Sequence, residues 1–465
     1  MATLVTLEVS FLALTAVFIG LDYGSLALVV VVAALACTFF RVRSSWSEAD
    51  WFLHPLRILI PLLVTFQLIY WFWFGLLGDI RPATDWDWML QQIDRRAMGG
   101  HLAAYLFRHV PLLIGLDLGL RTLRRQWATI ERREVTINPI AVLVVSFLAL
   151  TVATLGDAGL LSGNTVLAYL NTSTDRVFMT LYGLLVLLAV VPSFGKIYRI
   201  SALVLITFGL GAGIALSITI GMRYVVFQQI LIFVAILWTA GRIYERRAMS
   251  ARLVLILALS FPLFGVLTAV KFSASGDTSE FQNIASGIQF VGERGLQRLA
   301  PFTTDALIAE NRAADSLFTE VDSSMVRLAS AVPLLNTTLS LKSQNSDSLE
   351  KRIYTYTSKH WASAGDVSVF ISGASESVYA FGNTVGVLVI FLAGLLHGAV
   401  VSLSTRICGY INWVNVTSQY VLFALLGMDI SNFIRLPVNI LLGALVCYSL
   451  VHRWTHRPAS QTRMG

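Results

Sequence analysis

The sequence predicts an all-α polytopic membrane protein with about 12 transmembrane helices and one large, partly helical loop outside the membrane. Three observations lead to this fold class. Hydrophobic residues make up 56% of the 465 residues and charged residues only 13%, whereas about a quarter of a typical soluble domain is charged. The apolar residues fall in runs of about 20, which is long enough to cross the hydrocarbon core as helices. One long polar interval, Lys271 to Val378, interrupts these runs.

The expected spans follow one another along the chain and leave both termini on the cytoplasmic side. They cover residues 4–21, 25–40, 57–78, 101–120, 138–160, 177–191, 201–220, 225–240, 253–270, 379–403, 413–428 and 436–451. The chain therefore divides into transmembrane helices 1 to 9 (1–270), a large periplasmic loop (271–378), helices 10 to 12 (379–452) and a cytoplasmic tail (453–465). The first span lacks a basic flank and a small-residue cleavage site, so we expect it to be retained as a helix.

Two spans carry features beyond their hydropathy. The third, which Arg57 opens, ends in an aromatic cluster from Tyr70 to Phe74 that suits the outer membrane interface. The fourth is the weakest, because it carries Arg108 and Asp117. An unpaired charge at membrane depth is costly, so we expect these two side chains to pair with other helices.

Basic residues set the expected orientation. The loops and tail expected inside carry about three times as many Lys and Arg residues as the short outer loops, as the positive-inside rule requires. The most basic short loop follows the fourth span and contains Arg121, Arg124, Arg125, Arg132 and Arg133. Topology and attraction to membrane lipid explain the net charge of +7, so we expect no nucleic-acid partner.

No metal, cofactor or nucleotide site is expected. The three cysteines, Cys37, Cys408 and Cys447, lie in or beside expected spans, where they are small packing residues. The chain has no GxxxxGK[ST] phosphate loop. The two halves also lack the matched interrupted helices of a secondary transporter. Because the phosphate loop is missing, ATP-driven transport by this chain alone is not expected.

The long loop is expected to be partly helical. Short helices are expected over residues 288–308, 322–335 and 348–356, with breaks near Pro301 and Pro333. The second of them is largely apolar, so we expect it to dock on the transmembrane bundle.

Arginines in and beside this loop are candidate ligands for an anion. Arg294 and Arg298 are four residues apart, so they would share one helix face and could bind one anion together. Arg327 lies alone among apolar residues and needs a partner, either an anion or a loop carboxylate. Arg223 lies in a short turn between two spans, at the depth of lipid phosphates; the alternative role is snorkelling to lipid headgroups.

Three segments, taken in order, resemble the motifs of one family. They are Gly221-Met222-Arg223-Tyr224, Asp322-Ser323-Ser324-Met325-Val326-Arg327-Leu328 and Glu376-Ser377-Val378-Tyr379-Ala380-Phe381-Gly382. They are similar to the Gly-x-Arg turn, the loop arginine and the Glu-x-x-Tyr-x-x-Phe-Gly motif of Wzy-type O-antigen and exopolysaccharide repeat-unit polymerases, with Phe381 and Gly382 one residue early. Gly394-Leu395-Leu396-His397-Gly398 is similar to the small-residue segment that often follows. The resemblance in specific residues covers 221–398, and the resemblance in topology covers the whole chain.

The resemblance implies a membrane glycosyltransferase of the bacterial inner membrane that polymerises undecaprenyl-pyrophosphate-linked repeat units at the periplasmic face. It implies that Arg223 and Arg327 bind the lipid pyrophosphate, with Arg294 and Arg298 as further candidates. Guanidinium groups match phosphate oxygens and stay charged, so no metal is needed. The resemblance also implies Tyr379 as a substrate-binding residue.

The implied reaction is the attack of a hydroxyl of one repeat unit on the anomeric carbon of the growing chain, which leaves its lipid pyrophosphate. A base near the acceptor hydroxyl would help, and Glu376 or His360 is the candidate. The alternatives are that Glu376 pairs with an arginine at the interface and that His360 is a surface residue. Expected partners are the lipid-linked oligosaccharide, membrane lipid and, as a candidate, a chain-length regulator protein.

Three other functions fit parts of the sequence. Asp85-Trp86-Asp87 resembles the outer acidic pair of glycosyltransferases that use polyprenyl-phosphate sugars, but here it follows the third span. An O-antigen ligase has the same layout and the same lipid donor. A non-enzymatic polysaccharide exporter or flippase predicts charges that line the bundle at mid-membrane depth, whereas the charges singled out here gather at the outer edge.

Overall fold

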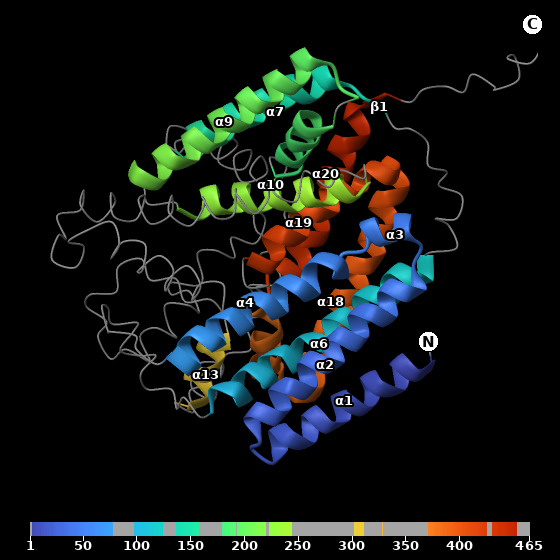
Figure 1. The fold of residues 1–465 in the computed structure, drawn as a ribbon, viewed down its shortest axis with the longest axis vertical. Helices are drawn as coiled ribbons and strands as arrows, with labels where there is room; N and C mark the ends of the chain where they lie inside the picture. Colours follow the sequence, from blue (N-terminus) through green and yellow to red (C-terminus); the bar gives the residue numbers. More distant parts are fainter. Residues whose placement is uncertain are drawn as a thin grey trace, which may run out of the picture.

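The computed structural model describes residues 2–77, 97–123, 136–157, 179–191, 193–219, 223–243, 302–310, 328, 371–425 and 430–452. Figure 1 shows that these residues form long helices packed side by side. Six helical segments among them are long and apolar enough to cross a membrane, and four shorter apolar helices accompany them. The expectation of an all-α membrane protein is therefore confirmed.

The long helices coincide with the expected spans, apart from residues 253–270, which lie outside the described residues. They are α1 (Ala2–Gly20), α2 (Gly24–Ser45), α4 (Leu56–Leu77), α6 (Met98–Leu123), α7 (Pro139–Asp157), the helix Met179–Val190, α9 (Lys196–Thr219), α10 (Arg223–Ile243), α18 (Gly373–Cys408), α19 (Asn412–Leu425) and α20 (Asn432–Leu450). Shorter helices are α3 (Glu48–Leu53), α13 (Phe302–Glu310) and the 3₁₀ turn η4 (Gly409–Ile411).

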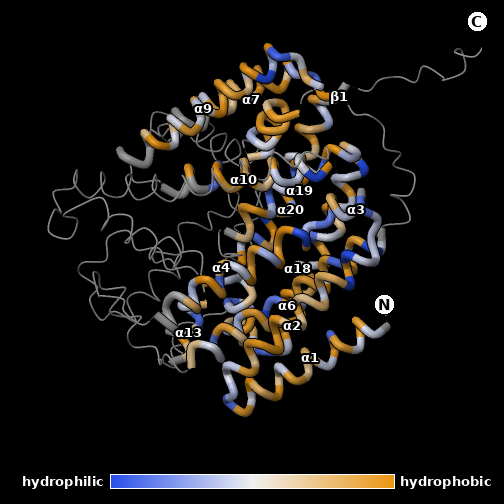
Figure 2. Tube along the Cα trace, in the orientation of Figure 1, coloured by the Kyte–Doolittle hydropathy of each residue, from blue (hydrophilic) through white to orange (hydrophobic). Residues whose placement is uncertain are grey.

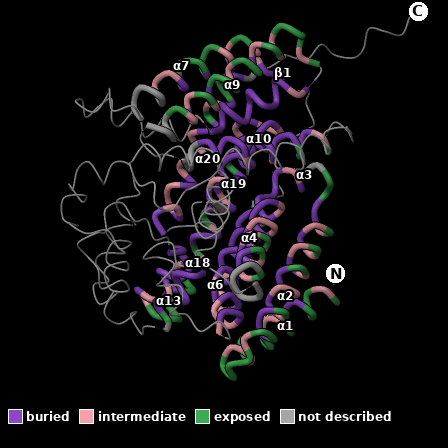
Figure 3. The backbone as a smooth tube through the Cα atoms, turned by 60° about the vertical axis from the view of Figure 1, so that its left-hand side comes forward, coloured by how far each residue is buried: buried purple, intermediate pink, exposed green. Residues whose placement is uncertain are grey.

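Apolar side chains cover both the inside and the outside of the bundle. Figure 2 shows hydrophobic residues along most of α1, α2, α7 and α9. Much of this apolar surface is exposed, for example at Val9, Phe147 and Ile197, whereas α6 and α18 are largely buried, as Figure 3 shows. Exposed apolar faces on peripheral helices suit contact with lipid tails, because lipid does not penalise apolar surface as water does.

The two central helices, α6 and α18, meet through glycines. A Cβ on Gly115 or Gly119 of α6 would overlap the backbone of α18, and one on Gly394 or Gly398 of α18 would overlap the backbone of α6. Glycines four residues apart let two helix backbones approach closely, which is a common mode of helix association in membranes. The small-residue segment noted in the sequence is therefore the α18 side of this contact.

The chain bends sharply within α18 at Gly382, whose φ is 76° and ψ is 168°. A Cβ added to Gly386 would lie only 2.5 Å from the carbonyl oxygen of Ser377, although nine residues separate the two positions. The segment from Gly373 to Phe381 therefore lies against the start of the long part of α18. The helix thus begins at Gly373, before the expected start of the span at Tyr379, and its long part follows the bend at Gly382.

Replacing Gly382 by alanine is expected to destabilise the protein by about 1–3 kcal/mol, because its combination of φ and ψ is essentially restricted to glycine. No atom of the described residues lies within 4 Å of the added Cβ, so the expected cost comes from backbone strain. Thermal unfolding in detergent measures it. The control is Gly20→Ala, where the Cβ also meets nothing and φ is not positive. An equal melting temperature for the two variants would contradict the expectation.

A two-residue antiparallel ladder joins the start of α7 to the end of α20. Strand β1 (Thr136–Ile137) pairs with β2 (Val451–His452), with Thr136 opposite His452 and Ile137 opposite Val451. The backbone N–H of Asn138 continues the ladder by donating to the carbonyl oxygen of Leu450. The ladder places the chain before α7 and the chain after α20 at the same end of the bundle, as the expected topology requires.

Candidate functional site

A helix from the expected periplasmic loop is inserted into the bundle. Figure 1 shows α13 beside the end of α4, the start of α6 and the lower end of α18. Phe302 anchors α13: its ring makes edge contacts with Tyr70 of α4 and Tyr105 of α6, at centroid distances of 5.9 and 6.4 Å. Leu328, in a later part of the same loop, also packs against the core. The described parts of the loop are thus docked on the helices; of the second expected loop helix, 322–335, all residues except Leu328 lie outside the described part of the chain.

Arg108 of α6 connects this inserted helix to α18. Its Nη1 donates to Asp305 Oδ2 at 3.0 Å, to the Tyr379 hydroxyl oxygen at 3.0 Å and to Ser375 Oγ at 3.4 Å. The guanidinium carbon also lies 4.7 Å from the centre of the Tyr379 ring, close enough for a cation–π interaction. We call Arg108, Asp305, Ser375 and Tyr379 the Arg108 cluster.

The guanidinium group of Arg108 keeps donors for a further ligand. All the hydrogen bonds above use Nη1, and Nε and Nη2 have no partner among the residues that the structure describes. The side chain is 23% exposed, so it is not sealed in. Because a guanidinium group can bind two oxygens side by side, the unused edge suits a carboxylate or phosphate.

Asp305 has one oxygen held and one oxygen without a partner. Its side chain is 3% exposed; Oδ2 accepts hydrogen bonds from Arg108 and from the Ser375 hydroxyl. Oδ1 is buried and has no hydrogen-bond partner in the described part of the chain. Burial raises the pKa of the Asp305 carboxyl above its usual value, although Arg108 and Ser375 act in the opposite direction. The carboxyl group is thus fixed in place and poised to exchange a proton above the usual range of aspartate.

The start of α18 explains why Ser375 and Tyr379 face Arg108 together. Ser372 caps the helix, because its Oγ accepts a hydrogen bond from the backbone N–H of Ser375 at 3.1 Å. Ser375 and Tyr379 are four residues apart, so they lie on one face of the helix. Glu376, the next residue after Ser375, is fully buried in the same turn.

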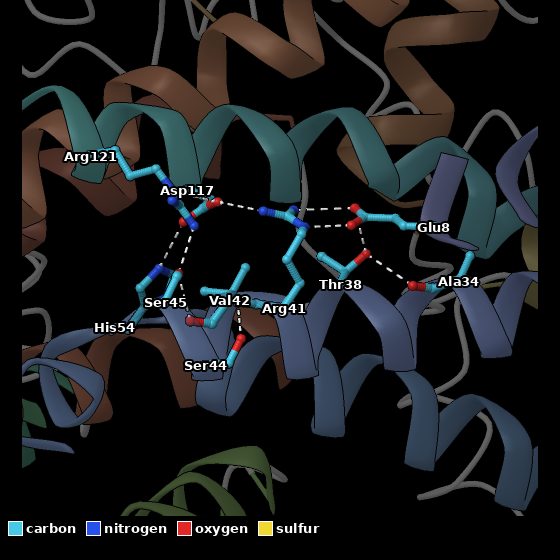
Figure 4. A network of polar contacts seen from close by, with 10 residues as sticks. All are labelled: Glu8, Ala34, Thr38, Arg41, Val42, Ser44, Ser45, His54, Asp117 and Arg121. Atoms are coloured by element: carbon cyan, nitrogen blue, oxygen red, sulfur yellow. Dashed lines mark hydrogen bonds and ion pairs between the residues drawn. The ribbon is translucent and has the colours of Figure 1, made fainter. Parts of the chain in front are cut away.

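A second charged cluster lies near the opposite end of α6 and is shown in Figure 4. Arg41 of α2 pairs with Glu8 of α1 at 2.5 Å and with Asp117 of α6 at 3.3 Å. Asp117 also accepts from Arg121 Nε at 2.9 Å and lies 3.4 Å from His54 Nε2. We call these five residues the Arg41 network. The expectation that Arg108 and Asp117 pair with other helices is confirmed by the two clusters.

His54 stays neutral in this network. The backbone N–H of Leu56 donates to His54 Nδ1 at 3.2 Å, so the proton of the neutral ring is on Nε2, which faces Asp117. Burial lowers the pKa of His54, and this effect exceeds the opposing effect of Asp117. The two carboxylates and two arginines of the network therefore balance in charge.

The structure brings together some of the site residues expected from the sequence. Glu376 and Tyr379 lie on the first turns of α18, and Tyr379 contacts Arg108 directly. Arg223 is the first residue of α10. The remaining expected residues lie outside the described part of the chain: Arg294, Arg298, Arg327 and His360.

Sequence reasoning did not identify Asp305 or Ser375 as site residues, and it treated Arg108 only as a charge in need of a partner. The available signal was Asp305 itself, a carboxylate in the otherwise uncharged stretch from Phe302 to Ala309, directly after Pro301. Its partner Arg108 is 197 residues away in the sequence, so the pairing is visible only in the fold.

Comparison with known proteins gives no relative. No protein-family model matches the chain, and neither a curated protein nor a solved structure matches it. The function is therefore inferred from the geometry of the clusters and from the resemblance of residues 221–398 to the polymerase motifs.

Proposed function

We propose that the protein polymerises undecaprenyl-pyrophosphate-linked oligosaccharide repeat units by glycosyl transfer, and that the Arg108 cluster belongs to its active site. The observation that carries the proposal is the unused edge of the Arg108 guanidinium. Nη1 of the same guanidinium group donates to Tyr379, which lies with Glu376 on the first turns of α18, and both of these residues belong to the polymerase-like motif. A helix of the long loop, α13, completes the cluster, which suits a loop that closes over a substrate.

The proposed topology has 12 spans in the bacterial inner membrane, with both termini in the cytoplasm and the long loop in the periplasm. The positions of the two charged clusters support it. α6 begins beside α13, the loop helix, and reaches the Arg41 network 9 residues after Arg108. The Arg41 network then lies toward the cytoplasm, where arginines are favoured, and the Arg108 cluster toward the periplasm.

In the proposed reaction, arginines hold the lipid pyrophosphate and stabilise its charge as it leaves. Arg108 is oriented by Asp305, Ser375 and Tyr379, so little reorganisation is needed when an anion binds its free edge. Arg223, Arg327, Arg294 and Arg298 are the further cationic candidates from the sequence. Glu376 and His360 are the candidates for the base that the resemblance implies.

Replacing Arg108 by glutamine tests the proposal. We expect surface polysaccharide to change from a ladder of chain lengths to single repeat units, with in vitro elongation reduced by about 10²–10³-fold, the usual cost of losing a charge-stabilising donor. Arg242→Gln is the matched control, because Arg242 is exposed at the end of α10. If R108Q leaves the ladder unchanged, the Arg108 cluster is not the active site. Loss of transfer to lipid A, with long polymer kept on the carrier lipid, would indicate an O-antigen ligase.

One observation favours a second candidate, a non-enzymatic polysaccharide exporter or flippase. Such a protein needs charges within the bundle, and the Arg41 network lies within the helices α1, α2 and α6, with Glu8 and Asp117 almost fully buried. Charges inside a membrane often mark a transport path. In this case, variants of the Arg41 network would accumulate lipid-linked units in the cytoplasmic leaflet, whereas a polymerase would leave single units on the periplasmic side.

A further inference from the structure

We propose that Asp305, on the inserted loop helix α13, is the general base that takes the proton of the acceptor hydroxyl. This inference rests on the proposed function, because it assigns one chemical step of the same glycosyl transfer. It replaces Glu376 and His360 in that role and gives α13 a catalytic task in addition to its packing.

The carboxyl group of Asp305 is held in one orientation through one of its two oxygens. Oδ2 is anchored by Arg108 at 3.0 Å and by the Ser375 hydroxyl, so the plane and direction of the carboxyl group are fixed. Oδ1 has no partner among the described residues and remains to accept a proton. A carboxylate that only fastened α13 to α6 would gain from a partner on both oxygens, because a buried polar atom without a hydrogen bond is destabilising.

The surroundings of Asp305 favour proton transfer over a permanent ion pair. Among the described residues, the charged or titratable groups that face it are Arg108, His101 and Tyr105 on α6 and Tyr379 on α18. Burial raises the pKa of the Asp305 carboxyl above its usual value, because its effect exceeds that of the nearby cations. Arg108 also has an unused edge that can bind an anion. The leaving pyrophosphate and the base would then both contact the guanidinium group of Arg108.

The step balances without a metal or a redox partner. The acceptor hydroxyl oxygen forms a bond to the anomeric carbon of the growing chain, and its proton moves to Asp305 Oδ1. The bond between the anomeric carbon and the pyrophosphate oxygen breaks, and its electron pair leaves with the lipid pyrophosphate, next to Arg108. Asp305 then returns its proton to water.

The test measures elongation against pH for purified full-length protein, with lipid-linked repeat units extracted from a strain that lacks it. We expect the wild-type rate to rise with pH, because the base acts when deprotonated. This rising part of the pH–rate profile, the acidic limb, should lie above the usual aspartate pKa of about 4. Asp305→Asn, whose amide oxygen can still accept from Arg108 and Ser375, should lower kcat by about 10²–10⁴-fold with little change in KM and should abolish the limb. Asp305→Glu should keep it.

Two controls separate a base from a packing residue. His101→Gln removes the nearby group that could also titrate, and the limb should persist in this variant. Thermal unfolding of D305N checks that the variant is folded at the assay temperature, because removing the partner charge of Arg108 is expected to lower its stability. The inference is overturned if D305N retains the limb, if the limb disappears in H101Q, or if the loss in D305N is explained by unfolding or by KM. Failure of the wild-type protein to elongate any unit would instead overturn the proposed function itself.

Discussion

Replacing Gly394 by leucine is expected to separate α6 from α18 and to cost more than the ~1–3 kcal/mol that overpacking usually costs. The backbone carbonyl oxygen of Leu112 occupies the place of a Cβ at this position, and backbone cannot move aside as a side chain can. The shift would reach the cluster as well, since Arg108 is on α6 and Ser375 and Tyr379 are on α18. Loss of both folding yield and elongation is therefore expected.

The matched control is Gly211→Leu. Gly211 lies inside α9, a Cβ there meets nothing within 4 Å, and leucine is a better helix former than glycine. Thermal unfolding in detergent of the two variants checks the expectation. Melting temperatures for G394L and G211L that agree within error would show that the glycine contact does not hold the two central helices together.

Replacing Arg41 by methionine is expected to destabilise the protein by about 3–5 kcal/mol, because it leaves the Glu8 carboxylate buried without its cation. Glu8 is 6% exposed, and its described contacts are Arg41 and the Thr38 hydroxyl. The double variant Glu8→Gln/Arg41→Met removes both charges of this pair and should recover most of the loss. Unfolding of the single and double variants, compared with Glu8→Gln alone, gives the coupling energy of the pair.

Glu48→Ala is the surface control for this series. Glu48 is an exposed carboxylate in the first turn of α3, so its removal should change stability by less than about 0.5 kcal/mol. A double variant that is as unstable as R41M would mean that Arg41 acts through its packing or through Asp117, and that Glu8 contributes little.

The long apolar helices could be predicted from the sequence because lipid imposes a strong rule. Every backbone polar group in the hydrocarbon core must be bonded within its own segment, so an apolar run of sufficient length has one solution, a helix. The same rule predicted that Arg108 and Asp117 need partners. It could not predict which residues those partners are. Arg41 is distant from Asp117 in the sequence, Asp305 is distant from Arg108, and no local pattern identifies either of them as a partner.

The candidate site could be predicted only in part. Glu376 and Tyr379 came from a motif, and the structure places Tyr379 on Arg108. Asp305 was not predicted, because a single carboxylate in a long polar loop resembles any solvated one until α13 is seen between α4, α6 and α18. No rule of sequence explains why Phe381 and Gly382 come one residue early in the motif. The positive φ of Gly382 does explain why this position is a glycine.

The bond between Glu8 and Arg41 also bears on how the chain enters the bilayer during synthesis. α1 and α2 form a hairpin in which Glu8 and Arg41 neutralise each other, so the insertion machinery handles a net-neutral pair. A lone arginine in an inserting helix costs about 2.5–3.5 kcal/mol at the helix centre on translocon-based scales and less near the helix end, where Arg41 lies in α2. α6 follows some 60 residues later in the chain and inserts beside this hairpin. Its Asp117 then adds a second carboxylate to Arg41.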